Sequence, residues 1–187
     1  MTHIELAVVA FVRACLQGVR GSVVPLGEVL GALRKVLPVE RVAFSVLARA
    51  RPAAARAGAL RAGAGGPFSY YGVGAEDGTV DVAGEGFVVQ PSDDPGVARV
   101  LGGAPAVIHR LQPEAPVDRA LWMKGIRSTA VFPLGCPDGV VFGTLMAGST
   151  LPDGLGEGAR ALLAAVAEEL RGPLWRAVGA AAQSGGR

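Results

Sequence analysis

The 187-residue sequence is poor in the residues that build metal and redox centres. It contains two cysteines, Cys15 and Cys136, and two histidines, His3 and His109. So small a set makes neither a disulfide framework nor a zinc cage. A chain of this length buries enough surface in one core to need no such staple. We therefore expect a single globular domain without a structural metal.

Long hydrophobic runs are also missing. The longest run with few charges, residues 4–16, contains Glu5 and Arg13, and it falls short of the roughly 18 residues that cross a bilayer. No Lys or Arg precedes it, as one would in a secretory signal. The formal net charge of +2 does not by itself indicate a nucleic-acid partner. These absences predict a soluble, cytoplasmic protein with no membrane contact and no direct nucleic-acid contact.

The charge that is present is unevenly spread, with +6 over residues 1–62 and −4 over residues 63–187. One stretch without acidic residues contains five arginines: Arg41, Arg49, Arg51, Arg56 and Arg61. These arginines could face phosphate groups, or they could keep a solvated hairpin soluble. Apart from Phe44, no aromatic residue for base stacking lies among them, which favours the hairpin.

The hydrophobic periodicity predicts an α+β protein. Residues 3–18, 25–37, 94–101, 116–124 and 155–178 have helical patterns, and residues 41–49, 105–108, 128–134 and 140–147 have strand patterns. Residues 52–63 fit either a returning strand or a short helix. The glycine-rich residues 63–86 read as irregular loop, and the tail after residue 179 as frayed.

The first helix is apolar nearly all round. Ile4, Val8 and Phe11 share one face, while Leu6 and Val9 lie on the other side. A helix of this kind must be buried by other parts of the protein, or by a partner, on both sides. We expect the second cover to be another subunit.

Several segments, in this order, resemble the GAF domain family of sensory and regulatory modules. Gly125 to Leu134 looks like the family's glycine–apolar–arginine–serine lead into a strand that closes with Pro-Leu. Residues 141–145 resemble its next strand, residues 37–44 the entry to its first strand, and residues 97–108 its short helix and following strand. The resemblance covers roughly residues 22–178 and is poorest at 50–86.

The resemblance implies a central antiparallel sheet of about six strands. Terminal helices would cover one face, and short helices and loops would cover a ligand pocket on the other. Residues 1–21 would form a dimerisation helix, 22–178 the GAF-like domain with a signalling helix at 152–178, and 179–187 a tail. Candidate pocket residues are Phe44, Tyr70, Phe87, His109, Trp122, Thr129 and Thr144. Candidate dimer residues are Val8, Phe11, Leu162, Val166 and Leu170.

Few individual residues match the chemistry that the resemblance offers. The family's enzymatic branch reduces free methionine sulfoxide with pocket cysteines, whereas Cys15 lies on a helix and Cys136 in a turn. A covalent bilin needs a cysteine within 60–125, and the cyclic-nucleotide-binding branch needs an asparagine; the sequence has neither. His109 could supply an axial haem ligand or a surface hydrogen bond. Trp122 could cap the pocket or belong to the core, and Tyr70 and Tyr71 could close over a ligand.

These considerations predict a non-enzymatic sensor. It would bind a small molecule, signal through its terminal helices as a homodimer, and control a downstream kinase, cyclase or transcription-activator domain. The alternative is a ligand-free homodimerisation module. A haem sensor and a redox enzyme are further alternatives.

Overall fold

The computed structural model describes residues 1–47, 68–74, 79–82, 87–136 and 139–184. Its helices are α1 (His3–Gln17), α2 (Leu26–Leu33), α4 (Pro95–Leu101), α5 (Pro116–Met123) and α6 (Glu157–Ser184), with a 3-10 turn at Pro91–Asp93. Its strands are β1 (Val23–Val24), β2 (Arg41–Leu47), β3 (Phe68–Gly74), β4 (Val80–Asp81), β5 (Phe87–Val89), β6 (Val107–Arg110), β7 (Ser128–Gly135) and β8 (Val141–Ser149). The predicted helices and strands outside residues 50–86 are therefore confirmed, with ends shifted by a few residues.

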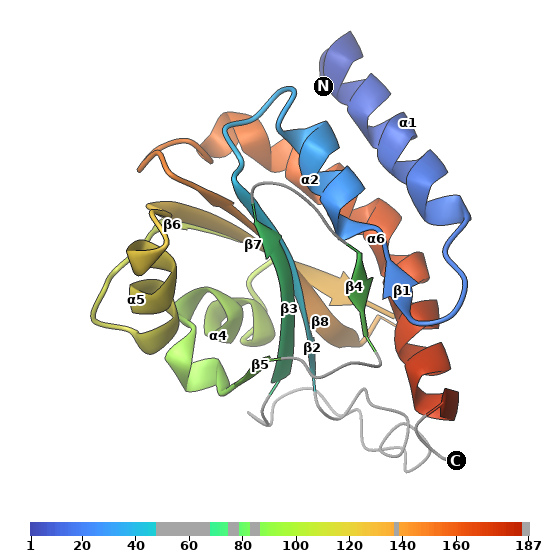
Figure 1. The fold of residues 1–187 in the computed structure, drawn as a ribbon. Coiled ribbons are helices and arrows are strands. Elements are labelled where there is room, and N and C mark those ends of the chain that lie inside the picture. The colour runs from blue at the N-terminus through green and yellow to red at the C-terminus, as the bar shows by residue number, and fades with distance from the viewer. Residues whose placement is uncertain (48–67, 75–78, 83–86, 137–138, 185–187) are drawn as a thin grey trace.

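Six strands form one antiparallel sheet in the order β5-β3-β2-β8-β7-β6. The short strands β1 and β4 pair separately. Helices α1, α2 and α6 lie on one side of the large sheet, and α4 and α5 lie on the other (Figure 1). The predicted α+β architecture, with terminal helices on one face and short helices on the other, is confirmed.

The strands feed two separate hydrophobic cores because their side chains alternate between the faces. Along β2, Val42, Phe44 and Val46 join the core beneath the terminal helices, whereas Ala43 joins the core beneath α4 and α5. We call the first the terminal-helix face and the second the α4/α5 face. Any residue on β2 is thereby committed to one face or the other.

A β-bulge on β8 shifts this alternation at one end of the sheet. Leu134 pairs with Gly143 and Gly135 pairs with Val141, so Phe142 is the extra residue. Its ring turns to the terminal-helix face, where it lies 5.1 Å from the ring of Trp175.

The helix ends follow local sequence signals. Thr2 and Glu5 form a reciprocal capping box at the start of α1. Asp94 caps α4 by accepting a hydrogen bond from the Val97 amide, and Pro95 occupies the first turn. Each signal was readable from the sequence, and both helices begin where those residues predict.

Two predictions about the chain's organisation need correction. The loop predicted over 63–86 contains strand β3, which lies between β5 and β2 in the large sheet, and strand β4. Helix α6 continues to Ser184, beyond residue 178 where a frayed tail was expected. Residues 52–63 and the four arginines that follow Arg41 in the acid-free stretch lie outside the described residues.

The proposed dimer residues also need correction. Val8, Leu162, Val166 and Leu170 are buried within the single chain, in the core between α1, α6 and the sheet. They therefore have no surface to offer a second subunit. Of the five, only Phe11 is exposed, with 41% of its surface accessible.

Candidate functional site

Four polar side chains gather beneath α4 and α5, next to the apolar core of the α4/α5 face. His109 Nε2 lies 3.5 Å from Asp118 Oδ2, and Thr129 Oγ1 lies 3.4 Å from His109 Nδ1. Asp94 and Asp118 are both 2% exposed and Thr129 is equally buried, whereas the His109 side chain is 17% exposed. We call His109, Asp118, Thr129 and Asp94 the polar cluster.

Each member is positioned by a different element. His109 on β6 is the cross-strand partner of Thr129 on β7, so both side chains project from the same face. Asp118 lies in the first turn of α5 and accepts a hydrogen bond of 2.8 Å from the Gln112 amide. Asp94 precedes α4. The two short helices therefore bring two carboxylates onto a histidine and a hydroxyl from the sheet.

Gly96 lets α4 approach this closely. A Cβ at that position would lie 2.9 Å from Val131 Cγ2, closer than real Cβ contacts come, and 3.0 Å from His109 Cε1, which is tighter than most of them. The absence of a side chain on Gly96 therefore seats the first turn of α4 directly against the His109 ring.

Asp94 is the least satisfied member of the polar cluster. Its Oδ1 accepts a hydrogen bond from the Val97 amide, whereas its buried Oδ2 has no hydrogen-bond partner. Burial raises the pKa of the Asp94 carboxyl, and the nearby charge of Asp118 raises it further. The hydrogen bond from Val97 and the charge of His109 oppose that rise. A half-satisfied buried carboxylate is unusual and calls for an explanation.

Thr144, another predicted pocket residue, lies on the same face but away from the cluster. It pairs with Pro133, four residues along β7 from Thr129, a separation of about 13 Å at the usual rise of a strand. Its hydroxyl lies 2.7 Å from the Ser45 hydroxyl, and both side chains are buried. Thr144 therefore has a partner within the protein, unlike Asp94 Oδ2.

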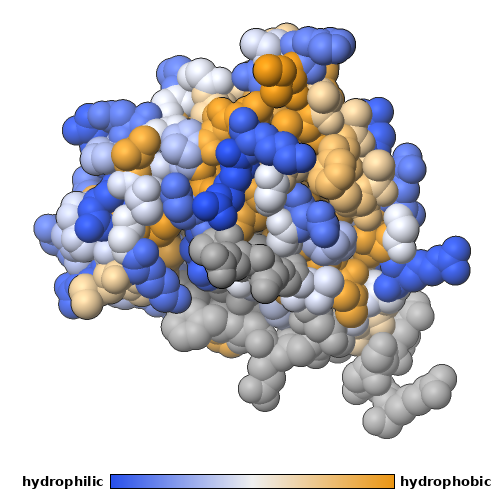
Figure 2. Space-filling view, turned by 45° about the horizontal axis from the view of Figure 1, so that its top comes forward, coloured by the Kyte–Doolittle hydropathy of each residue, from blue (hydrophilic) through white to orange (hydrophobic). Residues whose placement is uncertain are grey.

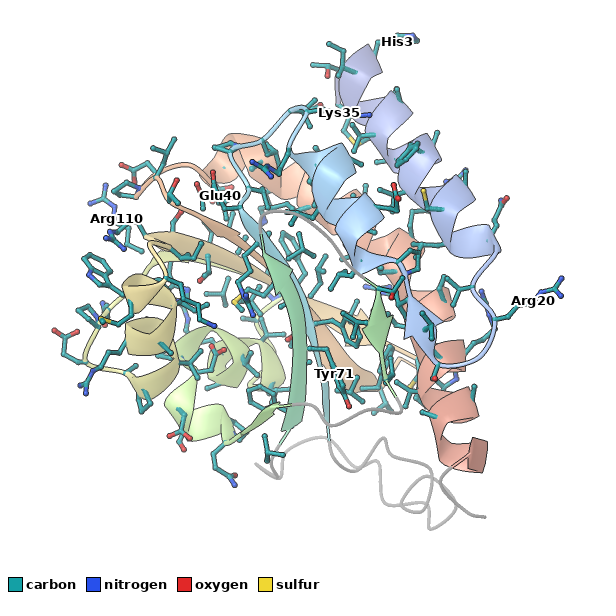
Figure 3. All side chains as sticks on the ribbon, in the orientation of Figure 1. His3, Arg20, Lys35, Glu40, Tyr71 and Arg110 are labelled. Carbon is teal, nitrogen blue, oxygen red and sulfur yellow. The ribbon has the colours of Figure 1, made fainter. Side chains whose placement is uncertain are left out.

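Phe44 does not line the α4/α5 face. Its ring is fully buried on the terminal-helix face and stacks on Tyr71 at a centroid distance of 5.3 Å. The Tyr71 hydroxyl donates to the Val82 carbonyl, and Figure 3 shows Tyr71 near β4. The predictions that Phe44 lines a pocket and that Tyr71 closes over it were wrong, because the strand alternation sends both rings to the other core.

Trp122 does not join the core. It is 37% exposed on α5, and the Arg127 guanidinium lies over its ring at 4.1 Å. For Tyr70 and Phe87 the structure gives the backbone register, in which they pair with each other and Tyr70 also pairs with Ser45. Of the predicted pocket residues, the structure thus brings His109 and Thr129 together.

The sequence analysis missed the two carboxylates. Asp94 stands directly before Pro95 at a helix start, a pattern typical of a cap, but nothing in that pattern shows that its second oxygen lacks a partner. Asp118 had a sequence signal, because it lies three residues before the buried Leu121 and so shares the inward stripe of α5. A charged residue on an apolar stripe is a signal worth following.

The surroundings of His109 do not fit a haem. The ring contacts the start of α4 at Gly96 and has Asp118 beside Nε2, so neither nitrogen faces open space in which a porphyrin could lie. Over the described parts of the chain, no three His, Cys, Asp or Glu side chains are grouped so that they could hold a metal ion. The same parts contain no helix long and apolar enough to span a membrane.

Comparison with known proteins shows similarity in fold and little in sequence. No family model and no curated protein matches the sequence. Among solved structures, the GAF domain of an Acinetobacter phosphoenolpyruvate-protein phosphotransferase superposes with a TM-score of 0.60 at 14% identity over 100% of both chains. The phycocyanobilin-bound GAF domain of a cyanobacterial phytochrome gives 0.58 at 12% identity, covering 95% of this chain and 97% of its own. The fold is GAF-like.

One GAF-like neighbour is an enzyme. The type II free methionine-R-sulfoxide reductase of Thermoplasma acidophilum superposes with a TM-score of 0.52 at 14% identity, covering 91% of this chain and 94% of its own. In the present chain both cysteines lie away from the polar cluster. Cys15 is on α1, and Cys136 is buried in the terminal-helix core, where its thiol donates to the Val140 carbonyl. The GAF-like fold therefore brings no thiol to the α4/α5 face.

Proposed function

We propose that this chain is a non-enzymatic sensory domain that binds a small molecule at the polar cluster. The observation that carries the proposal is the gathering of two buried carboxylates, a buried hydroxyl and a partly buried histidine on one face of a GAF-like sheet. Burying polar groups costs free energy unless each has a partner. A small molecule bound between the sheet and α4 and α5 would supply the missing partner.

Strand β7 offers a direct route from the polar cluster to the terminal helices. Thr129 projects from β7 into the cluster, and the next residue, Ala130, projects into the core beneath α6. Helix α6 packs against β7, and Arg13 joins α1 to α6 through a bidentate ion pair with Glu169. A shift of β7 on ligand binding would therefore move α6 and α1 together.

The partners that we propose follow from this route. The compared GAF domains include parts of a phosphotransferase and a phytochrome. We propose that this domain similarly controls a kinase, cyclase or transcription-activator domain through its terminal helices.

Native mass spectrometry of the whole chain, incubated with fractions of a bacterial small-molecule extract, tests the proposal. We expect one fraction to add mass to the wild-type protein. Thr129→Val keeps the shape of the side chain and removes a hydroxyl from the cluster, so it should reduce that addition. Thr144→Val makes the same chemical change about 13 Å away and should leave the addition intact. Equal losses in both variants, or no mass addition from any fraction, would contradict the proposal.

One observation favours a second candidate function, homodimerisation, with or without a ligand. The outward face of α1 carries Ile4, Ala7, Phe11 and Ala14, spaced three, four and three residues apart, and all four are exposed. Ile4 is 64% exposed, and the ring of Phe11 has Lys35 of α2 at 5.2 Å; Figure 3 labels Lys35 beside α1. This is the 3-4 spacing of a coiled-coil seam.

A second copy of the same helix is the occupant that fits this seam. Two such helices can interdigitate through identical residues, as in an isologous dimer. Figure 2 shows orange and pale orange atoms gathered at the upper right, where α1 lies. The seam has no charged residue in it to oppose self-pairing.

Sedimentation equilibrium distinguishes this seam from the buried residues that the sequence suggested. Phe11→Glu should convert a dimer to a folded monomer, because it places a charge in the seam without touching the core. Leu151→Glu is the matched control, since Leu151 is equally apolar and 52% exposed on the loop before α6. A wild-type monomer, or a dimer that persists in Phe11→Glu, would refute the α1 interface.

A further inference from the structure

Acidic groups outnumber basic groups inside the polar cluster. Asp94 and Asp118 both face it, and His109 is the single member that can carry a positive charge. Asp118 has two partners, the Gln112 amide and His109, whereas Asp94 Oδ2 has none. The cluster therefore lacks one hydrogen-bond donor, which would have to reach Asp94 Oδ2.

The arginines that directly follow His109 and Asp118 in the sequence are held elsewhere. Arg110 follows His109 but forms an ion pair of 2.7 Å with Asp153, and Figure 3 shows it at the outer edge of the molecule. Arg119 follows Asp118 but donates to the Pro113 and Glu114 carbonyls. Within the described residues no Lys or Arg pairs with Asp94 or Asp118. Among the described side chains, His109 is thus the one group that can offer these two carboxylates a positive charge.

We propose that the polar cluster takes a ligand with a cationic N–H donor, an amine, amidine or guanidine, which binds Asp94 Oδ2 and enters at the His109 edge. This inference rests on the proposed sensory function and specifies its ligand class. A charged donor is the strongest hydrogen-bonding partner for a buried carboxylate. It would also offset the excess negative charge, whereas an anionic ligand would add a third negative group beside Asp94 and Asp118.

The alternative is that Asp94 is a helix cap and nothing more. A cap needs the single oxygen that accepts from Val97, and Ser or Asn can supply it. Asp94→Asn therefore keeps the capping oxygen and removes the charge, and Asp94→Ala removes both. If capping alone matters, Asp94→Asn should bind every ligand as the wild type does.

Three isosteric probes separate ligand classes at the cluster: acetamidinium, acetamide and acetate. Binding to the whole chain is followed by NMR at constant ionic strength, through the Thr129 amide and the His109 Cε1–H signals. We expect acetamidinium to bind about tenfold more tightly than acetamide, and acetate not to bind at the cluster. Asp94→Asn should abolish the preference for acetamidinium. Asp153→Asn, which removes an exposed carboxylate, should leave that preference unchanged.

The outcomes separate the ligand class from the proposed function. Acetate binding as well as acetamidinium, or an unchanged preference in Asp94→Asn, would overturn the cationic class. If extract fractions still add mass through Thr129, the sensory function survives that result and only the ligand class is wrong. If neither the probes nor any fraction perturbs the cluster, both proposals fail.

Discussion

The hydroxyl pair of Ser45 and Thr144 gives a prediction that tests how buried polar groups behave on the α4/α5 face. The two oxygens lie 2.7 Å apart, and both side chains are about 1% exposed. Removing one hydroxyl leaves the other buried without its partner. We expect Ser45→Ala and Thr144→Val each to lower the free energy of unfolding by about 1–3 kcal/mol.

The double variant should cost much less than the sum of the two single variants. With both hydroxyls replaced by apolar groups, no unpaired polar atom remains, so the combined loss should be close to that of one single variant. We therefore expect a coupling free energy of about 1–2 kcal/mol in favour of the double variant. Urea denaturation of all four proteins, followed by circular dichroism, measures this cycle.

Additive losses would refute the reasoning. They would mean that each hydroxyl has a separate partner, and that Thr144 is available to a ligand as the sequence suggested. A cycle with the expected coupling would instead identify the pair as a structural link between β2 and β8, separate from the polar cluster.

Three further perturbations have outcomes that follow from the contacts described. Leu162→Ala should lower the free energy of unfolding by about 2–5 kcal/mol because it leaves a cavity beneath α6, whereas Leu151→Ala on the surface should change it by less than about 0.5 kcal/mol; thermal unfolding compares them. Gly96→Ala should destabilise the protein by about 1–2 kcal/mol through contact with Val131 and His109, and a stabilised variant would refute that packing. Because burial raises the pKa of Asp94 above 3.8, the folded state holds this proton more tightly than the unfolded chain. The stability of the wild type relative to Asp94→Asn should therefore be greatest below pH 3.8 and fall as the pH rises through the folded-state pKa, as urea titrations across that range would show.

Local patterns in the sequence were sufficient for most of the elements, and the caps explain why. Thr2 and Glu5 at α1, and Asp94 and Pro95 at α4, satisfy backbone groups within a few residues of themselves. Such signals do not depend on the rest of the fold. The strand pattern of residues 41–49 is equally local, and in β2 Val42, Phe44 and Val46 share one face.

The alternation of side chains along a strand does not show which face of the sheet a set of residues lies on. Phe44 was assigned to the pocket side, yet the terminal helices cover it. The same limit applied to α1, where the sequence grouped Val8 with Ile4 and Phe11. The fold buries Val8 against α6 and leaves Ile4 and Phe11 exposed. Choosing between faces depends on tertiary packing, which a single-helix pattern does not contain.

Strand β3 was missed because its glycines were read as loop formers. Gly72 lies within the strand, and a Cβ there would lie 2.7 Å from Nη2 of Arg41 and 2.9 Å from Cβ of Ala43. The absence of a side chain on Gly72 leaves room for the Arg41 side chain of the neighbouring strand β2. This role can be recognised only once β2 and β3 are known to pair.

Only part of the candidate site was predicted, because its other members depend on how the helices pack on the sheet. His109 and Thr129 come from neighbouring strands whose pairing follows from the sheet order. Asp94 and Asp118 reach them from two helices that cross the sheet, and the angle of that crossing is not encoded in either helix alone. The carboxylates therefore became candidates only once the structure placed them beside His109.

The central claim is that a small molecule binds at the polar cluster, and the most direct test is to map its binding site by NMR, from the shifts of the assigned backbone amide signals. The extract fraction that adds mass to the protein is titrated into the labelled wild-type chain. We predict that the largest shifts fall on the amides of Asp94, Gly96, Val97, His109, Asp118 and Thr129, with smaller shifts along α6. Shifts confined to the outer face of α1, or spread over the terminal-helix core with the polar cluster unchanged, would contradict a ligand site beneath α4 and α5.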